Sequence, residues 1–315
     1  MGCPMNTVDE NAIEISSNTL LANDPVLSVI VITYNHANFI SECIESIANQ
    51  ETDFQFEILI SEDCSSDNTR QIVIEYQKKF PQLIRALYGE KNLGPGRNFL
   101  RALRNSRGRF IAICEGDDQW DDVTKLQKQV TYLLNHSDIV VTYHDAISIN
   151  DKGEIIADTQ LESKRGQYDF TASQLQSGMY LPTLTMCFRK VLNELPDEYF
   201  RVVNQDTFLI SLLGAYGGAK FIEDIRPAKY RVHEGGIWST LNSLEKNIMH
   251  ITTAYWLSAY HKKIGNLHIS THYTSYAETK LLEQLYIEKT DLLKIVFKWM
   301  FKGIYKKYRQ IRYGY

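Results

Sequence analysis

The stretch LSVIVIT, residues 27–33, decides the fold of this chain. It is a short, β-branched apolar run that lies between Pro25 and Asn35. Such a run suits a strand that is buried on both faces, as the strands of a parallel sheet are. Similar runs follow along the chain, FEILIS at 56–61 and RFIAIC at 109–114, and they predict further strands of the same sheet.

The segments between these runs have helical patterns. After the first strand, the apolar residues Ile40, Cys43, Ile44 and Ile47 recur at helical spacing. After the second strand, Asp67 can cap the helix that follows it. Strands that alternate with helices predict an α/β fold with a Rossmann-like, doubly wound and mostly parallel sheet. Ligands of such sheets bind beyond the carboxyl ends of the strands.

The composition excludes several classes of protein. The chain has 315 residues, 44% of them hydrophobic and 23% charged, which is typical of globular proteins. A net charge of -4 argues against a nucleic-acid binder. Five scattered cysteines form no CxxC pair, so we expect neither a zinc ribbon nor a disulfide framework. The start lacks the features of a secretory signal, and no stretch reaches ~18 consecutive apolar residues, so we expect a cytoplasmic protein.

An acidic cluster follows the strand at 109–114. Glu115, Asp117 and Asp118 come directly after this buried strand. Carboxylates at such a place are natural ligands for a hard divalent cation, which keeps coordination sites open for phosphate oxygens. The alternative is a solvated loop. That alternative suits the nearby Asp121, which fits the first turn of a helix, where the macrodipole favours acids.

Two other polar stretches also follow strands. Asp63, in SEDCSSDNT at 61–69, could accept a hydrogen bond from an N–H of a nucleobase such as uracil, or it could form a turn. NLGPGRNF at 92–99 combines glycines, which permit close backbone approach, with a helix start whose N–H groups can bind an anion. Arg97 in this stretch could face a nucleotide, or it could be a solvated side chain after a Gly-Pro turn.

Four motifs in this order resemble the family 2 glycosyltransferases. They are VIVITYNH, ILISEDCSSDNT, NLGPGRNF and ICEGDDQWDDVTKLQKQV. The resemblance covers residues 27–145 well and continues more thinly to about residue 240. It implies a GT-A fold, a nucleotide-sugar donor that is usually UDP-linked, and an inverting transfer.

The resemblance also implies how the nucleotide is bound. It places Thr33 and Tyr34, after the first strand, on either side of the base. The acid that matches Asp63 binds the base, and the arginine that matches Arg97 lies near it.

A metal site is implied in the same way. The DxD-type motif of the family falls on Glu115, Asp117 and Asp118. Glu115, where the family commonly has Asp, is expected at the ribose. Asp117 is the first choice as ligand of Mn²⁺ or Mg²⁺, with Asp118 close behind. His233, in YRVHEGGIWS, matches a position that can complete the metal site, although a lone histidine is usually structural.

An inverting transfer also needs a base. The acceptor hydroxyl must lose a proton as it attacks the anomeric carbon, and a carboxylate can take that proton. The family places its base in an acidic pair that a helix follows. Here the pair is Gln205-Asp206, so Asp206 is predicted to be the base. The alternative is an acid that is favoured by a helix N-terminus.

The C-terminal segment 291–315 differs from the rest. It carries seven Lys and Arg residues and one Asp, a net charge of +6, and aromatic and aliphatic residues alternate with the bases. This pattern suits an amphipathic helix on an anionic membrane surface. The alternative is a helix that packs on the catalytic domain and exposes a basic face.

These patterns divide the chain into three parts. We expect a polar, loosely ordered leader over 1–25, a GT-A catalytic domain over 26–240 and a helical C-terminal extension over 241–315. Within the catalytic domain, residues 26–145 are expected to bind the nucleotide and 146–240 the acceptor.

The sequence therefore predicts an inverting, metal-dependent glycosyltransferase. Its partners would be a nucleotide-sugar donor and a glycan or lipid-linked acceptor of bacterial surface polysaccharide assembly, with no nucleic acid. It would be cytoplasmic or peripheral on the inner face of the plasma membrane. A sugar-1-phosphate nucleotidyltransferase would need a glycine-rich basic loop where this chain has TYNHANF. A non-catalytic nucleotide-sugar or carbohydrate binding protein is the alternative, and it would not need Asp206.

Overall fold

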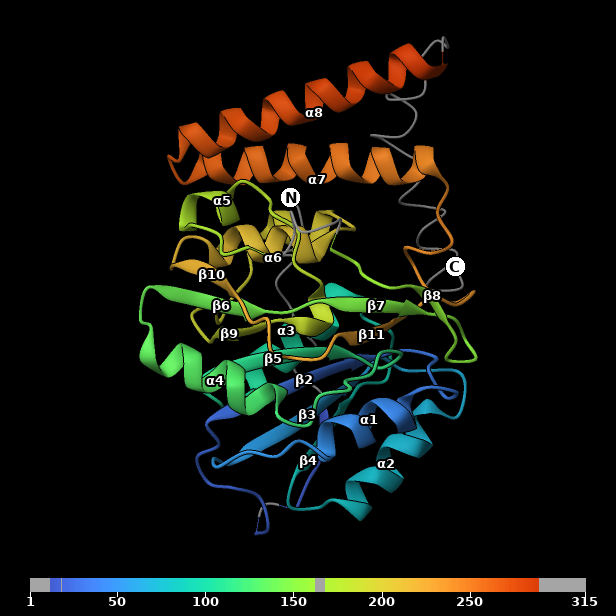
Figure 1. Ribbon diagram of the computed structural model, residues 1–315. Helices are drawn as coiled ribbons and strands as arrows, with labels where there is room; N and C mark the ends of the chain where they lie inside the picture. The colour runs from blue at the N-terminus through green and yellow to red at the C-terminus, as the bar shows by residue number, and fades with distance from the viewer. Residues whose placement is uncertain (1–11, 18, 162–167, 289–315) are drawn as a thin grey trace.

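A mostly parallel sheet forms the centre of the molecule (Figure 1). The computed structural model describes residues 12–17, 19–161 and 168–288. Over these residues the main sheet has eight strands in the order β1-β4-β3-β2-β5-β9-β6-β10. β1 and β9 run antiparallel to their neighbours, and the other pairs are parallel. The strands are β1 Ile13–Ile15, β2 Leu27–Thr33, β3 Phe56–Glu62, β4 Ile84–Tyr88, β5 Phe110–Glu115, β6 Ile139–Tyr143, β9 Cys187–Arg189 and β10 Gly218–Phe221.

Helices cover both faces of this sheet, as the doubly wound prediction requires. Residues of β2 alternate between the faces: Val29 and Val31 belong to the core under α1, α2 and α4, whereas Ile30 belongs to the core under α3 and α6. Each fully buried side chain of this kind contributes roughly 1.5–3 kcal/mol to stability. The helices are α1 Ile40–Ala48, α2 Thr69–Lys79, α3 Pro95–Asn105, α4 Lys125–Asn135, α5 Ala172–Gln176 and α6 Gln205–Leu213.

A small second sheet stands beside the main one. Its order is β11-β7-β8, with β11 parallel and β8 antiparallel to β7. The strands are β7 Ala146–Ile149, β8 Ile155–Ala157 and β11 Ala228–Arg231. Because β11 ends just before His233, this sheet positions that histidine beside Asp117, which follows β5 of the main sheet.

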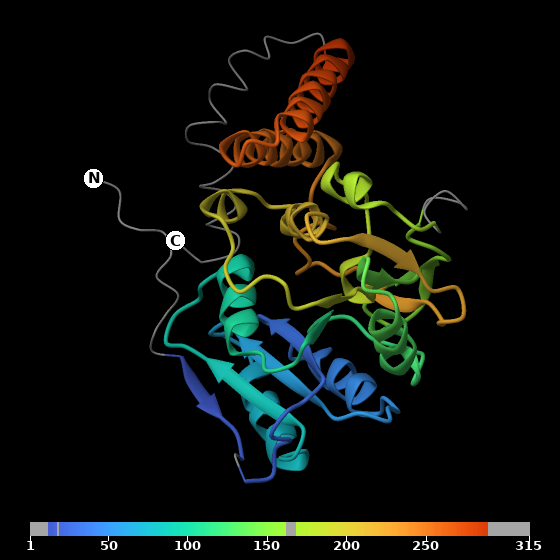
Figure 2. The same ribbon diagram turned by 90° about the vertical axis from the view of Figure 1, so that its left-hand side faces the viewer.

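Two long helices form an antiparallel hairpin at the C-terminal side. They are α7, Ser243–Lys263, and α8, Leu267–Glu288. Figures 1 and 2 place the hairpin on the α6 side of the molecule, away from α1 and α2. Within the part of the chain that the structure describes, no helix combines the length and apolarity that a membrane span needs. The basic segment 291–315 lies outside the described residues.

The leader prediction is wrong over residues 13–15. These residues form β1 and pair with β4. Glu14 accepts two hydrogen bonds of 2.8 Å from the guanidinium of Arg85, which also contacts Glu57. Because the Arg85 side chain is only 8% exposed, a second carboxylate from the leader helps to compensate its buried charge. This partner is distant in sequence, so local polarity did not reveal it.

Candidate active site

The carboxyl ends of β2, β3 and β5 meet at one edge of the sheet and open into a cavity of about 1430 Å³. This is the edge at which the alternation of strands and helices in the sequence predicted ligand binding. The loops after these strands, the start of α6 and the segment after β11 line the cavity. Residues from both halves of the catalytic domain therefore face one space.

The loop between β2 and α1 is held in one conformation by the loop after β3. Asn35 has a left-handed φ of 57°, which Asn tolerates better than most residues. Its backbone N–H donates to Ser65 Oγ, and its side chain accepts from Ser66 N. Asp67 accepts from Ala37 N and from Thr69 N, the first residue of α2, so it ties the two loops together, although the N-cap position of α2 is Asn68. The polar run after β3 thus orients the residues that follow β2.

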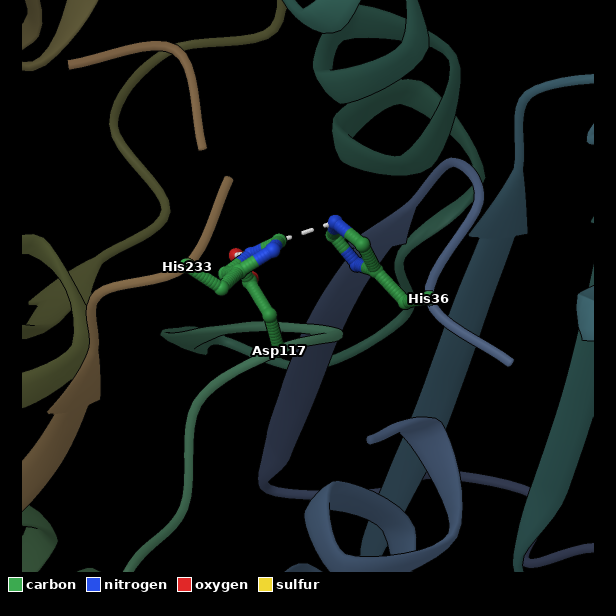
Figure 3. A group of neighbouring side chains, drawn as sticks. All are labelled: His36, Asp117 and His233. Carbon is green, nitrogen blue, oxygen red and sulfur yellow. Dashed lines mark hydrogen bonds and ion pairs between the residues drawn. The ribbon is translucent and has the colours of Figure 1, made fainter. Parts of the chain in front are cut away.

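His36, Asp117 and His233 point toward one another in the cavity (Figure 3). The Asp117 Oδ2 atom lies 3.0 Å from Nε2 of His233 and 3.7 Å from Nε2 of His36. One ligand atom from each residue lies within 4.8 Å of the others. The three side chains are partly exposed, at 16% for His36, 17% for Asp117 and 10% for His233. A cation that enters the cavity could therefore reach all three.

The electrostatics of this group suit a cation. Burial alone would raise the pKa of Asp117, but His36 and His233 outweigh burial and lower the pKa to about 2. Asp117 is therefore an anion at neutral pH. Two imidazoles and one carboxylate form a donor set that fits a divalent transition ion such as Mn²⁺.

His36 was missed in the sequence analysis. The only signal was its place in TYNH, directly after a strand end that faces the site. Gly116 explains how His36 comes so close to Asp117. A Cβ atom at Gly116 would lie 2.6 Å from Thr33 Oγ1 and 2.9 Å from His36 Nδ1. The turn after β5 can approach the end of β2 only because residue 116 has no side chain.

The structure does not bring Asp118 into this group. Asp118 is 2% exposed, and its Oδ1 accepts a hydrogen bond from the backbone N–H of Arg231. Its Oδ2 is buried without a hydrogen-bond partner. Burial, followed by the charges of Asp117 and Glu115, raises the pKa of Asp118 well above its ordinary value. The prediction of a metal ligand at Asp118 is not supported by this geometry.

Arg231 also holds the turn after β5 in place. Its Nε donates to the carbonyl of Asp117, and its guanidinium forms a 2.6 Å ion pair with Glu42. The guanidinium also lies 4.8 Å from the ring centroid of Phe39, which in turn packs 4.9 Å from the ring of His233. These contacts fix the directions of both Asp117 and His233.

Asp63 stands at the cavity wall and shapes the next turn. Its two carboxylate oxygens accept hydrogen bonds from Leu93 N and Gly94 N, at 2.8 and 2.9 Å. Gly94 has a φ of 81°, a conformation that glycine adopts without strain. Each carboxylate oxygen can accept more than one hydrogen bond, so these contacts are compatible with the predicted contact to a base.

Arg97 does not face the cavity as predicted. It lies on α3, and its guanidinium packs 5.6 Å from the ring centroid of Phe200. The wall of the cavity near this point is formed by Pro95 and Asn98. The helical turn points Arg97 to the opposite side from these residues.

Three other predicted nucleotide contacts do line the cavity: Thr33, Tyr34 and Glu115. Thr33 ends β2, and its carbonyl accepts from Asp63 N, which holds the two strand ends together. Glu115 ends β5, where it pairs with Ile32, the residue before Thr33.

Asp206 reaches the same cavity from the first turn of α6. Its Oδ1 accepts from Thr207 N at 2.7 Å, and burial raises its pKa. Its neighbour Gln205 packs against Gly96 so closely that a Cβ at Gly96 would lie 2.2 Å from the amide nitrogen. The helix start that carries Asp206 is therefore anchored on the start of α3.

Sequence comparison agrees with this geometry. The family profile described as Glycosyl transferase family 2 matches residues 28–196, more than half of the chain. The chain belongs to glycosyl transferase family 2. The matched segment includes β2, β3 and β5 with the loops that follow them, and so it includes His36, Asp63 and Asp117.

A sequence relative and two solved structures are also similar to this chain, and the structures share its fold. Uncharacterized protein Rv1520 of Mycobacterium tuberculosis is 31% identical over 214 residues, which cover 67% of this chain and 60% of that protein. The crystal structure of Staphylococcus aureus TarS 1-349 with UDP-GlcNAc has a TM-score of 0.52 at 20% identity, covering 75% of this chain and 72% of that one. The mannosyltransferase PcManGT from Pyrobaculum calidifontis, in complex with GDP-Man and Mn²⁺, has a TM-score of 0.52 at 16% identity, covering 91% and 84%. This glycosyltransferase thus has the GT-A fold.

Two site residues of this family 2 glycosyltransferase lie beyond the matched segment. Asp206 and His233 both come after residue 196. Their roles therefore depend on the tertiary structure, in which both line the cavity that Asp117 also lines.

Proposed function

We propose that this protein is an inverting, metal-dependent glycosyltransferase that moves a sugar from a UDP-linked donor to an acceptor hydroxyl. The observation that supports this most is that His36, Asp117 and His233 line the same cavity as Asp206. A cation-binding group and a carboxylate with a raised pKa are the two devices that such a transfer requires.

The donor nucleotide would occupy the part of the cavity between the ends of β2 and β3. Asp63 would accept an N–H of the base, Thr33 and Tyr34 would flank it, and Glu115 would contact the ribose. TarS, which shares the fold, has been solved with UDP-GlcNAc, and PcManGT with GDP-Man. Uracil, thymine and guanine rings all offer an N–H to Asp63, so we favour UDP because TarS, which shares the fold, was solved with UDP-GlcNAc.

His36, Asp117 and His233 would hold the metal ion. A bound Mn²⁺ or Mg²⁺ would stabilise negative charge on the departing nucleoside diphosphate. We favour Mn²⁺, because Mg²⁺ prefers oxygen ligands and imidazole suits transition ions better. PcManGT is recorded with Mn²⁺.

Asp206 would act as the base. A single displacement inverts the anomeric carbon, and it requires that the acceptor hydroxyl loses its proton to a nearby group. Because burial raises the pKa of Asp206, its carboxylate is a stronger base than an ordinary aspartate. It lines the cavity from the first turn of α6, where it could receive that proton.

The central experiment measures nucleoside diphosphate release and metal-dependent binding. The chain is titrated with UDP in a calorimeter, with Mn²⁺ and with EDTA, and is then assayed against UDP-, GDP- and dTDP-sugars. We expect UDP binding only with the metal, and the binding should be weakened in Asp117→Asn. The anomeric configuration of the product, followed by NMR, should be inverted. Metal-independent binding would refute the metal site, and absence of turnover with every donor would favour a binding protein.

The acceptor would be a glycan or lipid-linked saccharide of a bacterial cell surface. TarS of Staphylococcus aureus, 33% identical over 115 residues that cover 36% of this chain and 20% of that protein, is named as a poly(ribitol-phosphate) beta-N-acetylglucosaminyltransferase. We further propose that the basic segment 291–315 binds the inner face of the plasma membrane. Sedimentation with anionic liposomes, with and without this segment, tests the membrane part: equal pelleting of both forms would refute it.

A further inference from the structure

The cavity reaches α7, and several residues that line it have no role in the proposed transfer. Tyr180 and Gln160 line it from the segment before β9, Trp238 lines it from the segment after β11, and His250 lines it from α7. In the sequence, only Trp238 lies in a motif quoted above, YRVHEGGIWS, and that motif pointed to His233. These residues are aromatic or polar, and they come from parts of the chain that lie far apart in sequence.

Tyr180 is fixed beside the proposed base. Its hydroxyl donates to Gln160 Oε1 at 2.8 Å, and the amide of Gln160 donates in turn to Ser148 Oγ at 3.2 Å. Tyr180 and Asp206 line the same cavity, and after burial the charge of Asp206 contributes to the raised pKa of Tyr180. Tyr180 is nevertheless 50% exposed. Its ring is therefore held in place and open to a ligand.

Trp238 is fixed from α7. The ammonium group of Lys246 lies 5.3 Å from the centroid of the Trp238 ring, and the ring of His250 meets it edge-on at 5.4 Å and 74°. Ser239, the next residue, donates from Oγ to the carbonyls of His233 and Gly236. These contacts tie Trp238 to the same short turn as the metal-binding His233.

The helix α8 holds the segment that carries Tyr180. The Tyr273 hydroxyl donates to the carbonyl of Gln176 at 2.8 Å. Gly178, with a φ of 89°, passes so close that a Cβ there would lie 3.1 Å from the Tyr273 hydroxyl. The α7–α8 hairpin thus positions both aromatic side chains: α7 contacts Trp238, and α8 contacts the segment that carries Tyr180.

We propose that Tyr180 and Trp238 form the acceptor subsite, and that the acceptor binds there as a saccharide ring with its reacting hydroxyl toward Asp206. This inference rests on the proposed function and names the part of the site that binds the acceptor. A sugar ring has apolar C–H faces and hydroxyl groups at its edge. The fixed aromatic rings can pack against the C–H faces of the sugar. The Gln160 amide and the Asp206 carboxylate can form hydrogen bonds with its hydroxyl groups.

The test titrates simple glycosides into the full chain in the presence of UDP and Mn²⁺. The probes are the methyl glycosides of glucose, N-acetylglucosamine and mannose, with glycerol 3-phosphate as a non-saccharide. Binding is read by saturation-transfer NMR and by tryptophan fluorescence. We expect at least one glycoside to bind, and Trp238→Ala and Tyr180→Ala each to weaken it by about tenfold or more. Trp238→Phe and Tyr180→Phe should restore most of the affinity, because each keeps an aromatic face.

A matched control separates this subsite from general effects. Tyr216 is equally exposed, at 51%, and lies off the cavity wall, so Tyr216→Ala should bind the glycoside as the wild type does. Unchanged affinity in both Tyr180→Ala and Trp238→Ala would overturn the inference, and so would binding of glycerol 3-phosphate alone or of no glycoside. Failure of UDP and Mn²⁺ to bind would refute the proposed function instead, since glycoside binding can be measured without them.

Discussion

Replacement of Gly116 by alanine should damage the metal group and the fold together. The added Cβ would lie 2.6 Å from Thr33 Oγ1, 2.8 Å from Thr33 Cβ and 2.9 Å from His36 Nδ1. All three distances are shorter than carbon contacts allow, so at least one neighbour must move. Thr33 is buried at the end of β2, whereas His36 lies on a loop, so we expect His36 to be displaced.

The size of the effect follows from this clash. Overpacking of this kind costs about 1–3 kcal/mol. For a domain of this size each kcal/mol corresponds to about 2–4 °C, so the melting temperature should fall by roughly 2–12 °C. Displacement of one of three ligands should weaken Mn²⁺ binding by about 10–100-fold, the range measured when support of a metal ligand is lost.

Calorimetric titration of Mn²⁺ and thermal unfolding of Gly116→Ala measure both quantities. His36→Ala is the matched variant, because it removes the ligand without the clash and should lose metal affinity with little loss of stability. In the double variant the stability cost should be smaller than the sum of the two single costs. Wild-type Mn²⁺ affinity in Gly116→Ala, despite a lowered melting temperature, would refute the assignment of His36 as a ligand.

Three more predictions concern the base, a buried ion pair and a buried histidine. Asp206→Asn should lower turnover by about 10²–10⁴-fold without loss of UDP affinity, and undiminished turnover would refute the assignment of Asp206 as the base. Because burial raises the pKa of Asp206, the acid limb of the pH profile of kcat/KM for the wild type should lie above the ordinary aspartate range. Glu57→Ala leaves the buried guanidinium of Arg85 with one partner fewer, so the free energy of unfolding in urea should fall by about 3–5 kcal/mol. Burial lowers the pKa of His261, whose Nε2 contacts Ser211 Oγ, to about 4. The unfolded chain therefore takes up this proton first, and the free energy of unfolding should fall by up to about 3 kcal/mol as the pH drops from ~6.5 to 4. His261→Asn should lose that part of the pH dependence, and an unchanged dependence would contradict this account.

Several features of the site were predictable because they follow from local chemistry. Apolar, β-branched runs predicted β2, β3 and β5, and acids directly after such runs predicted a ligand site at the carboxyl edge of the sheet. Asp63 and Asp117 lie on the cavity wall for this reason. The family motifs carried the same information, since each consists of a strand end and its loop.

Adjacent residues could not be assigned in the same way. Asp117 and Asp118 have the same side chain and lie one position apart, yet Asp117 faces the two histidines while Asp118 accepts from Arg231 N inside the protein. The difference comes from the turn after β5, whose path depends on the close approach between Gly116 and the end of β2. A side-chain direction in a turn depends on such contacts, which no spacing in the sequence encodes.

The sequence by itself determined the α/β class, the strand ends and the acids at them, because burial patterns and charge are local properties of the chain. Only the tertiary structure decided that His36 joins Asp117 and His233, that Arg97 packs on Phe200, and that the α7–α8 hairpin holds Tyr180 and Trp238 in the lining of the cavity that Asp206 also lines. These contacts join residues that lie far apart in the chain. They form only when strand register, loop conformation and helix packing are set together.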